Sequence, residues 1–257
     1  MKNVLDKVGN GKAQSPLREC LAMISRKIVF VRIAGLLIPS LFLFAGTEKH
    51  KEHGKQTYYY DTSREGQTAK TTTTWTVKNE KGLLRLHGKD GKGETNVTVS
   101  PGPDTESFSY RETKSGSGYA IERDRTYVSV KKTDNGQTVE KRLYVGSTPW
   151  IQEFDFSLRP FILSSSPAFK FYIVHPEKLS LHHLVATKSS TSVPVRIGGK
   201  EYKAIPVTIS LSGLKKFFWK ADLMFEKTTG DLLTYRANDG PGTPVVTTVF
   251  SGKKPKG

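Results

Sequence analysis

From residue 67 onward, apolar and polar positions alternate along the chain with a period of two. Between residues 70 and 78, the odd positions end in Trp75 and Val77, whereas the even positions hold only threonine and lysine. Alternation of this kind predicts a β-strand with one buried face. Similar runs follow at 82–87, 95–99, 107–112, 119–123, 126–132 and 138–145. The pairs Asp90-Gly91 and Asn135-Gly136 lie between such runs and predict tight turns, so adjacent strands are expected to pair as antiparallel hairpins.

One segment breaks this alternation. Serine and threonine precede Pro149, and Glu153 follows in the next turn, which is the composition of a helix start. Apolar residues then recur at helical spacing: Trp150, Phe154, Leu158, Phe161 and Ile162. The sequence therefore predicts one substantial helix over 149–164, whose apolar stripe packs against the sheet.

Strands resume near residue 169 and continue to residue 250, with a Gly198-Gly199 pair that predicts a further hairpin. The expected fold is mainly β: a strongly curved antiparallel sheet or half-open barrel with one covering helix. Six apolar residues of the helix and of a late strand are expected to face the inside of this sheet. They form the candidate ligand-binding face: Trp150, Phe154, Phe161, Trp219, Leu223 and Phe225.

The N-terminal part has a different pattern, a cationic start followed by an apolar run. A basic pair precedes eighteen residues from Ile28 to Ala45, of which only Arg32 is charged. This composition is typical of a secretory signal peptide and predicts export to the periplasm or cell envelope, with cleavage near Ala45 or Gly46. An uncleaved membrane anchor is the main alternative, because eighteen residues are at the short end of the roughly 17 to 25 that span a bilayer. A buried helix of a cytosolic domain is a weaker alternative, since no polar face interrupts the run.

These patterns predict two parts of the chain. Residues 1–46 are expected to form an N-terminal extension and signal peptide, and residues 47–257 an antiparallel β domain. A change of texture near 147–167 leaves open whether this domain has one lobe or two. The 22 residues before Met23 lack periodicity and are interpreted as an upstream extension, because signal peptides normally begin close to the first Met, so the translation start is left open.

Charge and cysteine content narrow the classes of function. Residues 47–257 hold 33 Lys and Arg against 22 Asp and Glu, a net charge of +11, and the densest basic cluster lies at 253–256. Such an excess raises the local concentration of anionic partners, such as phospholipid headgroups. The only cysteine is Cys20, so the β domain can hold neither a disulfide nor a thiolate metal site. Its stability must come from an apolar core.

A resemblance to known proteins rests on the segment 218–235. It reads as a strand, a Thr228-Thr229-Gly230-Asp231 turn and a second strand, preceded by the strand 199–207. This layout resembles a hairpin of exported bacterial domains of unknown function that are distantly similar to lipoprotein carriers of the LolA and LolB type, over residues 168–250. The resemblance implies a curved antiparallel sheet whose concave side is plugged by a helix and shelters an apolar ligand. It supplies no catalytic residues.

Motifs for catalysis or cofactor binding are missing from the sequence. The six histidines form no His-Glu-x-x-His motif and no cluster at metal spacing. Ser129 and Lys132 match a Ser-x-x-Lys pattern, but they lie in a predicted strand, where that nucleophile would open a helix. The glycine-rich run 88–93 lacks the Gly-Lys-Ser/Thr ending of a phosphate loop. We therefore predict no metal and no cofactor, and the sequence favours a non-enzymatic protein.

The predicted function is that of an exported envelope protein that binds an amphipathic or anionic ligand, such as a lipid or an acylated partner. An anionic membrane surface is a further expected partner. The alternatives are an envelope assembly scaffold that acts through strand edges and an enzyme of unrecognised type. Nucleic-acid binding, suggested by aromatic residues beside lysines at 215–220, is disfavoured by the predicted export. The sequence identifies neither the ligand nor the oligomeric state.

Overall fold

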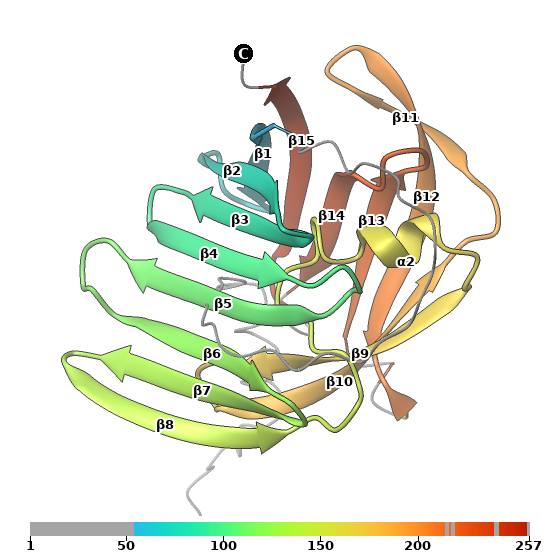
Figure 1. The fold of residues 1–257 in the computed structure, drawn as a ribbon. Coiled ribbons are helices and arrows are strands. Elements are labelled where there is room, and N and C mark those ends of the chain that lie inside the picture. Colours follow the sequence, from blue (N-terminus) through green and yellow to red (C-terminus); the bar gives the residue numbers. More distant parts are fainter. Residues whose placement is uncertain (1–53, 214–215, 217–218, 239–241, 256–257) are drawn as a thin grey trace, which may run out of the picture.

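The structure is a computed structural model, and it describes residues 54–213, 216, 219–238 and 242–255 (Figure 1). These residues form one antiparallel sheet of fifteen strands, together with the short helix α2 (Arg159–Leu163). The mainly β fold and the open, curved sheet predicted from the sequence are confirmed. The predicted extension and signal or anchor segment, with Cys20, lie outside the described residues.

The strands follow one another along the chain in two groups on either side of α2. The first group contains β1 (Gln56–Arg64), β2 (Lys70–Glu80), β3 (Leu83–Lys89), β4 (Gly93–Val99), β5 (Thr105–Glu112), β6 (Gly118–Asp124), β7 (Tyr127–Asp134) and β8 (Gln137–Tyr144). The second contains β9 (Ala168–His175), β10 (Ser180–Lys188), β11 (Val193–Ile197), β12 (Lys200–Leu211), β13 (Lys220–Glu226), β14 (Leu232–Asn238) and β15 (Val245–Pro255).

Nearly all strand neighbours are sequence neighbours joined by tight turns. The order in the sheet is β8-β7-β6-β5-β4-β3-β2-β1-β15-β14-β13-β12-β10-β9, and β11 pairs with β12 outside this path. Asn135 and Gly136 both have positive φ, 49° and 78°, as the predicted two-residue turn between β7 and β8 requires. Only β1 with β15 and β10 with β12 are adjacent without being consecutive.

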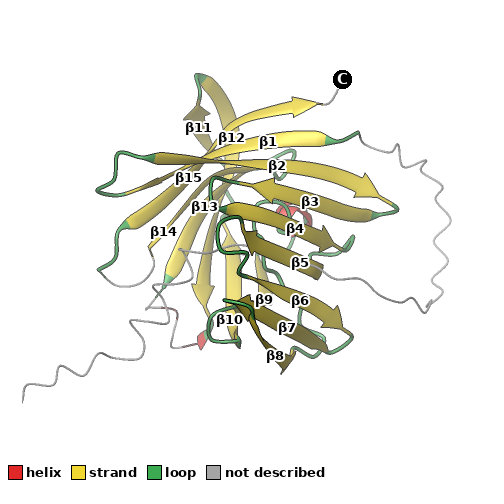
Figure 2. Cartoon of the chain, turned by 90° about the vertical axis from the view of Figure 1, so that its left-hand side faces the viewer, coloured by secondary structure: helices red, strands yellow, loops and turns green. Residues whose placement is uncertain are grey.

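The sheet bends so that its two groups of strands face each other across a common core. Figure 1 shows β3–β8 in teal to yellow-green as one side and the strands of the second group in orange to dark red as the other, and Figure 2 shows the same strands fanning around the molecule. Tyr58, Trp75 and Phe156 fill the space between them, with ring centroids of Phe156 5.0 Å from Tyr58 and 5.7 Å from Trp75. The concave side of the sheet is therefore packed with aromatic side chains rather than hollow.

Residues 149–152 form a strap between the two sides of the bent sheet. The Thr105 N–H donates to the carbonyl of Trp150, and the Ile151 N–H donates to the carbonyl of Tyr172, each at 2.8 Å. Gln152 extends the strap with its side chain, whose amide donates to the Val174 carbonyl and accepts from the Val174 N–H, both at 2.9 Å. The strap thus joins β5 to β9 where the strands themselves do not pair.

The predicted helix over 149–164 is wrong in its extent, because helical structure is confined to Arg159–Leu163. The Glu153 carboxylate accepts hydrogen bonds from the N–H groups of Asp155, Phe156 and Ser157. These donors are therefore held by a side chain instead of by carbonyls four residues earlier, so a turn forms where a helix was expected. Apolar residues are frequent in this segment because nearly every residue from 150 to 158 is buried. They do not mark the single buried face of a helix.

Within the described residues, no helix is long and apolar enough to cross a membrane.

Candidate functional site

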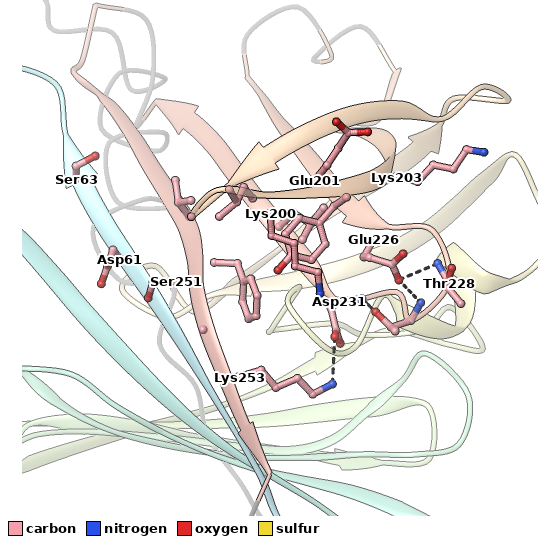
Figure 3. Close-up of a pocket in the computed structure, with 18 of the residues that line it drawn as sticks. Asp61, Ser63, Lys200, Glu201, Lys203, Glu226, Thr228, Asp231, Ser251 and Lys253 are labelled. Carbon is pink, nitrogen blue, oxygen red and sulfur yellow. Dashed lines mark hydrogen bonds and ion pairs between the residues drawn. The ribbon is translucent and has the colours of Figure 1, made fainter.

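A groove of about 970 Å³ lies between the β11–β12 hairpin and strand β15 (Figure 3). The hairpin arches over the inner face of β15, and the turn between β13 and β14 closes the groove below. The hairpin can fold back sharply because Gly198 and Gly199 both have positive φ, 55° and 80°. The main lining residues from the hairpin, β14 and β15 are Ile197, Lys200, Glu201, Tyr202, Lys203, Asp231, Leu233, Phe250 and Lys253.

One wall of the groove is apolar and aromatic. Tyr202 and Phe250 meet edge to face with ring centroids 6.3 Å apart, so β12 and β15 contact each other across the groove. Phe250 also packs against Tyr60 of the core at 5.8 Å. Ile197 and Leu233 complete this wall. The groove therefore borders the core directly without reaching into it.

The rim and floor of the groove are charged. Four lysines line it, at positions 70, 200, 203 and 253, and so do four acidic residues, at positions 61, 201, 226 and 231. The Glu226 carboxylate is engaged by the N–H groups of Thr228 and Thr229 and shapes the β13–β14 turn. The groove is thus balanced in charge, with its cations at the rim and on β15.

Asp231 anchors the floor between two cations. It is 8% exposed, and its two carboxylate oxygens lie 2.5 Å from Nη2 of Arg159 and 3.2 Å from Nζ of Lys253. Burial lowers the pKa of Lys253, but the hydrogen bond with Tyr58 and the Asp231 carboxylate outweigh this and raise it above its usual value. Lys253 also lies 4.6 Å from the centre of the Tyr58 ring. A fixed positive charge therefore stands at the inner end of the groove.

Two further carboxyls lie behind this floor. Burial, together with the charge of Asp155, raises the pKa of Glu153 well above its usual value, even though three backbone N–H groups lower it. Burial raises the pKa of Asp155 to about 7, against the lowering effects of Arg159 and of a hydrogen bond from Trp75. Neither carboxyl lines the groove, and the Glu153 oxygens are occupied by its own backbone. This pair therefore serves the fold and offers no acid and base to a ligand.

All six residues of the predicted ligand-binding face lie in the hydrophobic core. None is more than 3% exposed, and none lines the groove; they are Trp150, Phe154, Phe161, Trp219, Leu223 and Phe225. Their role in ligand binding stays a prediction. The groove residues had weaker signals in the sequence, namely the Gly-Gly hairpin and the basic cluster at 253–256. Nothing in the sequence brought these two segments together.

Histidines and carboxylates do not gather into a metal centre. In the part of the chain that the structure describes, no three His, Cys, Asp or Glu side chains are placed to hold an ion. His175 and His182 come closest together, with ring centroids 5.7 Å apart on neighbouring strands.

No protein-family model and no curated protein matches the chain. Among solved structures, it is similar to the β-barrel-like protein of the domain of unknown function DUF1849 from Brucella abortus, at 9% identity and a TM-score of 0.52, with 80% of this chain and 99% of that chain covered. This similarity shows a shared fold. The shared fold confirms the resemblance to bacterial domains of unknown function that the sequence indicated.

Two more distant structures belong to the same group of matches. The hypothetical lipoprotein YmcC from Escherichia coli is 10% identical, with coverage of 81% and 92% and a TM-score of 0.33. A LolA superfamily protein from Nitrosomonas europaea is 8% identical, with coverage of 80% and 87% and a TM-score of 0.25. The second of these structures carries the LolA name that the sequence resemblance also gave.

Proposed function

We propose that the protein is an exported, non-enzymatic envelope protein that binds an amphipathic, anionic ligand, such as a lipid or an acylated partner, in the groove beneath the β11–β12 hairpin. The observation that supports this most directly is that an aromatic wall, formed by Tyr202 and Phe250, lies beside a charged rim that includes lysines. Pockets for small ligands commonly combine an apolar lining with a few placed polar groups.

Each half of such a ligand has a matching part of the groove. An acyl chain against Ile197, Tyr202 and Phe250 would gain about 25 cal/mol for each Å² of apolar surface removed from water. Lys70, Lys200 and Lys203 would attract the headgroup, since no carboxylate of the described residues forms an ion pair with them. The net charge of +11 for residues 47–257 favours the same sign of ligand.

The packed core limits where the ligand can bind. Because aromatic side chains fill the concave side of the sheet, a deep acyl-binding cavity is not part of this proposal. The ligand is expected to lie along the groove with one face open to water. A lipid presented by a membrane or attached to a partner suits such an open groove.

Fluorescent fatty-acyl titration at low and high salt tests the proposal, with mass spectrometry of protein extracted from its own membranes to identify co-purifying lipid. Affinity should fall with salt but persist, because the apolar contribution is not screened. The double variant Lys200→Glu/Lys203→Glu should weaken binding about tenfold, or about 1.4 kcal/mol. Lys114→Glu/Lys170→Glu makes the same charge change on exposed residues outside the groove and should bind normally. Absence of both saturable probe binding and co-purifying lipid would refute the proposal.

The proposed export rests on the apolar run 28–45 and needs a separate experiment. N-terminal sequencing of protein from the envelope fraction should find a start near Gly46 or Thr47. An intact Met1 or Met23 terminus in a soluble cytosolic pool would contradict this part of the proposal.

A further inference from the structure

Strand β8 is an open edge of the sheet. It is the first strand in the sheet order and pairs with β7 alone among the described strands (Figure 1). Every second residue of an edge strand directs its N–H and C=O groups away from its neighbour, and these groups form a ready template for another strand. Proteins usually protect such an edge from pairing with other strands. The side chains of β8 therefore indicate whether this edge is protected or is available to a partner strand.

Strand β8 exposes large apolar side chains beside charged ones. Of the three large apolar residues that are exposed in the described part of the chain, two lie on β8: Val139, 56% exposed, and Tyr144, 65% exposed. The third is Leu163 of α2. Between the two apolar residues of β8 lies the charged sequence Glu140-Lys141-Arg142. The edge therefore carries both apolar and charged groups with which a partner strand could pair.

Pairing of β8 with a second copy of itself restricts the register. When a two-fold axis relates two antiparallel strands, residues that lie opposite each other project from the same face of the sheet. One residue of β8 must therefore lie opposite the same residue of the second copy. A pair centred on Glu140 would place Val139 opposite Lys141 of the other copy. A pair centred on Val139 would place Gln137 opposite Lys141. Neither register matches apolar with apolar and cation with anion.

The register centred on Lys141 places apolar residues opposite apolar residues and a cation opposite an anion. It places Glu140 opposite Arg142 of the second copy, and Val139 opposite Leu143, each twice by symmetry. Leu143 already packs against the edge of the core, so Val139 of the second copy would extend this apolar strip. Cross-strand pairs of these two kinds stabilise a sheet.

Arg142 is ordered by contacts within its own chain. Its Nη2 lies 2.5 Å from Oδ2 of Asp124, and its guanidinium stacks on the Tyr127 ring at 4.1 Å. Tyr144 packs edge to face against the same Tyr127 ring at 5.3 Å. Arg142 and Tyr144 therefore lie on one face of β7 and β8, and little of their side-chain freedom is left to be lost when a second copy pairs with the β8 edge.

We propose that two copies of the chain pair through β8 around a two-fold axis at Lys141, which joins their two sheets into one continuous sheet. The two Lys141 side chains meet at the axis and are the one unfavourable contact. Their repulsion makes the dimer reversible, and removal of this charge should tighten it. The proposal is independent of the ligand groove, which lies at the β11–β12 hairpin and β15.

Sedimentation velocity of the full chain in mild detergent tests the register by charge reversal. The wild-type chain should sediment as a concentration-dependent dimer. Glu140→Arg and Arg142→Glu should each be monomeric alone, because each places like charges opposite one another, whereas an equimolar mixture of the two variants should dimerise again. Lys141→Thr should dimerise at least as tightly as the wild type. As a control, Glu94→Arg makes the same charge change as Glu140→Arg, but on β4, which has a strand on both sides, and should leave the dimer intact.

Disulfide trapping gives a second measurement that does not depend on the strength of the dimer. In a Cys20→Ser background, Lys141→Cys should form a covalent dimer under mild oxidation, because opposed residues of antiparallel strands have Cα atoms about 4.5–5.5 Å apart, within disulfide range. Glu140→Cys should not, since it lies opposite Arg142 of the second copy. A monomeric wild-type chain, a mixture of charge variants that stays monomeric, or a covalent dimer formed by the Glu140→Cys variant but not by the Lys141→Cys variant would each overturn the proposal.

Discussion

Arg159 and Asp231 lie 72 positions apart in the sequence and form an ion pair of 2.5 Å between Nη2 and Oδ1. Their side chains are 18% and 11% exposed. The Arg159 guanidinium also lies 4.6 Å from the centre of the Phe156 ring. This ion pair connects the start of α2 to the turn before β14. It thereby connects the floor of the groove to the core.

Replacement of Arg159 by Met should destabilise the fold by about 2 kcal/mol, because it leaves the Asp231 carboxylate largely buried with one cation fewer. Urea unfolding of the single variants and of Arg159→Met/Asp231→Asn measures the coupling in a double-mutant cycle. Lys89→Met serves as the control, since the Lys89–Glu94 pair is similarly short at 2.6 Å but its side chains are 63% and 46% exposed, and the substitution should cost less than about 1 kcal/mol. Equal costs for Arg159→Met and Lys89→Met would contradict the importance of burial here.

The unfolding free energy should depend on pH through Asp155. Folding raises the pKa of this carboxyl from 3.8 to about 7, so the native state binds its proton more tightly than the unfolded state. The contribution of Asp155 to stability is therefore complete below pH 3.8 and is lost as the pH rises to about 7.

The variant Asp155→Asn keeps a hydrogen-bond acceptor but cannot ionise. Denaturant unfolding across this pH range should show that the variant gains stability relative to the wild type as the pH rises, by up to about 1.4 kcal/mol per pH unit. Asp124→Asn, which removes an exposed carboxyl, should show no such gain. A difference between Asp155→Asn and the wild type that does not change with pH would refute the assignment.

Gly118 of β6 should tolerate no side chain. A Cβ atom there would lie 2.1 Å from the carbonyl oxygen of Tyr110, a backbone atom of the paired strand β5 that cannot turn aside. Gly118→Ala should therefore cost about 1–3 kcal/mol in thermal or urea unfolding. Gly91→Ala is the matched control, because nothing lies within 4 Å of its Cβ position, and its stability should stay near that of the wild type.

Trp219 should contribute to stability as a core residue. It is 2% exposed, and its indole Nε1 donates to the Asn238 carbonyl at 3.0 Å. Trp219→Ala should lower the unfolding free energy by about 3–5 kcal/mol. Leu163→Ala, at a residue that is 54% exposed, should change it by less than about 0.5 kcal/mol. A small loss at Trp219 would show that the residue just before β13 is not packed as described.

The strands were predictable from the sequence because a strand and its turn are local. The alternation around Trp75 and the Asn135-Gly136 pair each fix a structure within about ten residues. The segment 149–158 was mispredicted because its hydrogen bonds are not local. Gln152 pairs with a strand 22 residues away, and Glu153 caps its own turn, so apolar spacing alone suggested a helix.

The groove could not be predicted, because its walls come from separate hairpins. Tyr202 and Phe250 are ordinary apolar positions of their strands, and only the curvature of the sheet brings them together. The six aromatic and aliphatic residues chosen from the sequence were those with the strongest periodicity. Strong periodicity selects residues that pack in the core, whereas a surface groove is lined by residues with a mixed environment.

The pairing of β1 with β15 has a consequence for the order of events during folding. Every other strand, apart from the β10–β12 step, finds a partner next to it in the sequence and can form a hairpin within microseconds. Strand β1 has to wait for residues 245–255 before its second edge is covered, as the register from Gln56 with Pro255 to Arg64 with Val246 shows. Closing so long a loop is slow, and until then the tyrosine-rich β1 lies at the end of a half-built sheet. A nascent chain interrupted before residues 245–255 are made would keep this edge of β1 exposed to aggregation, so we expect the pairing of β1 with β15 to be a late step of folding.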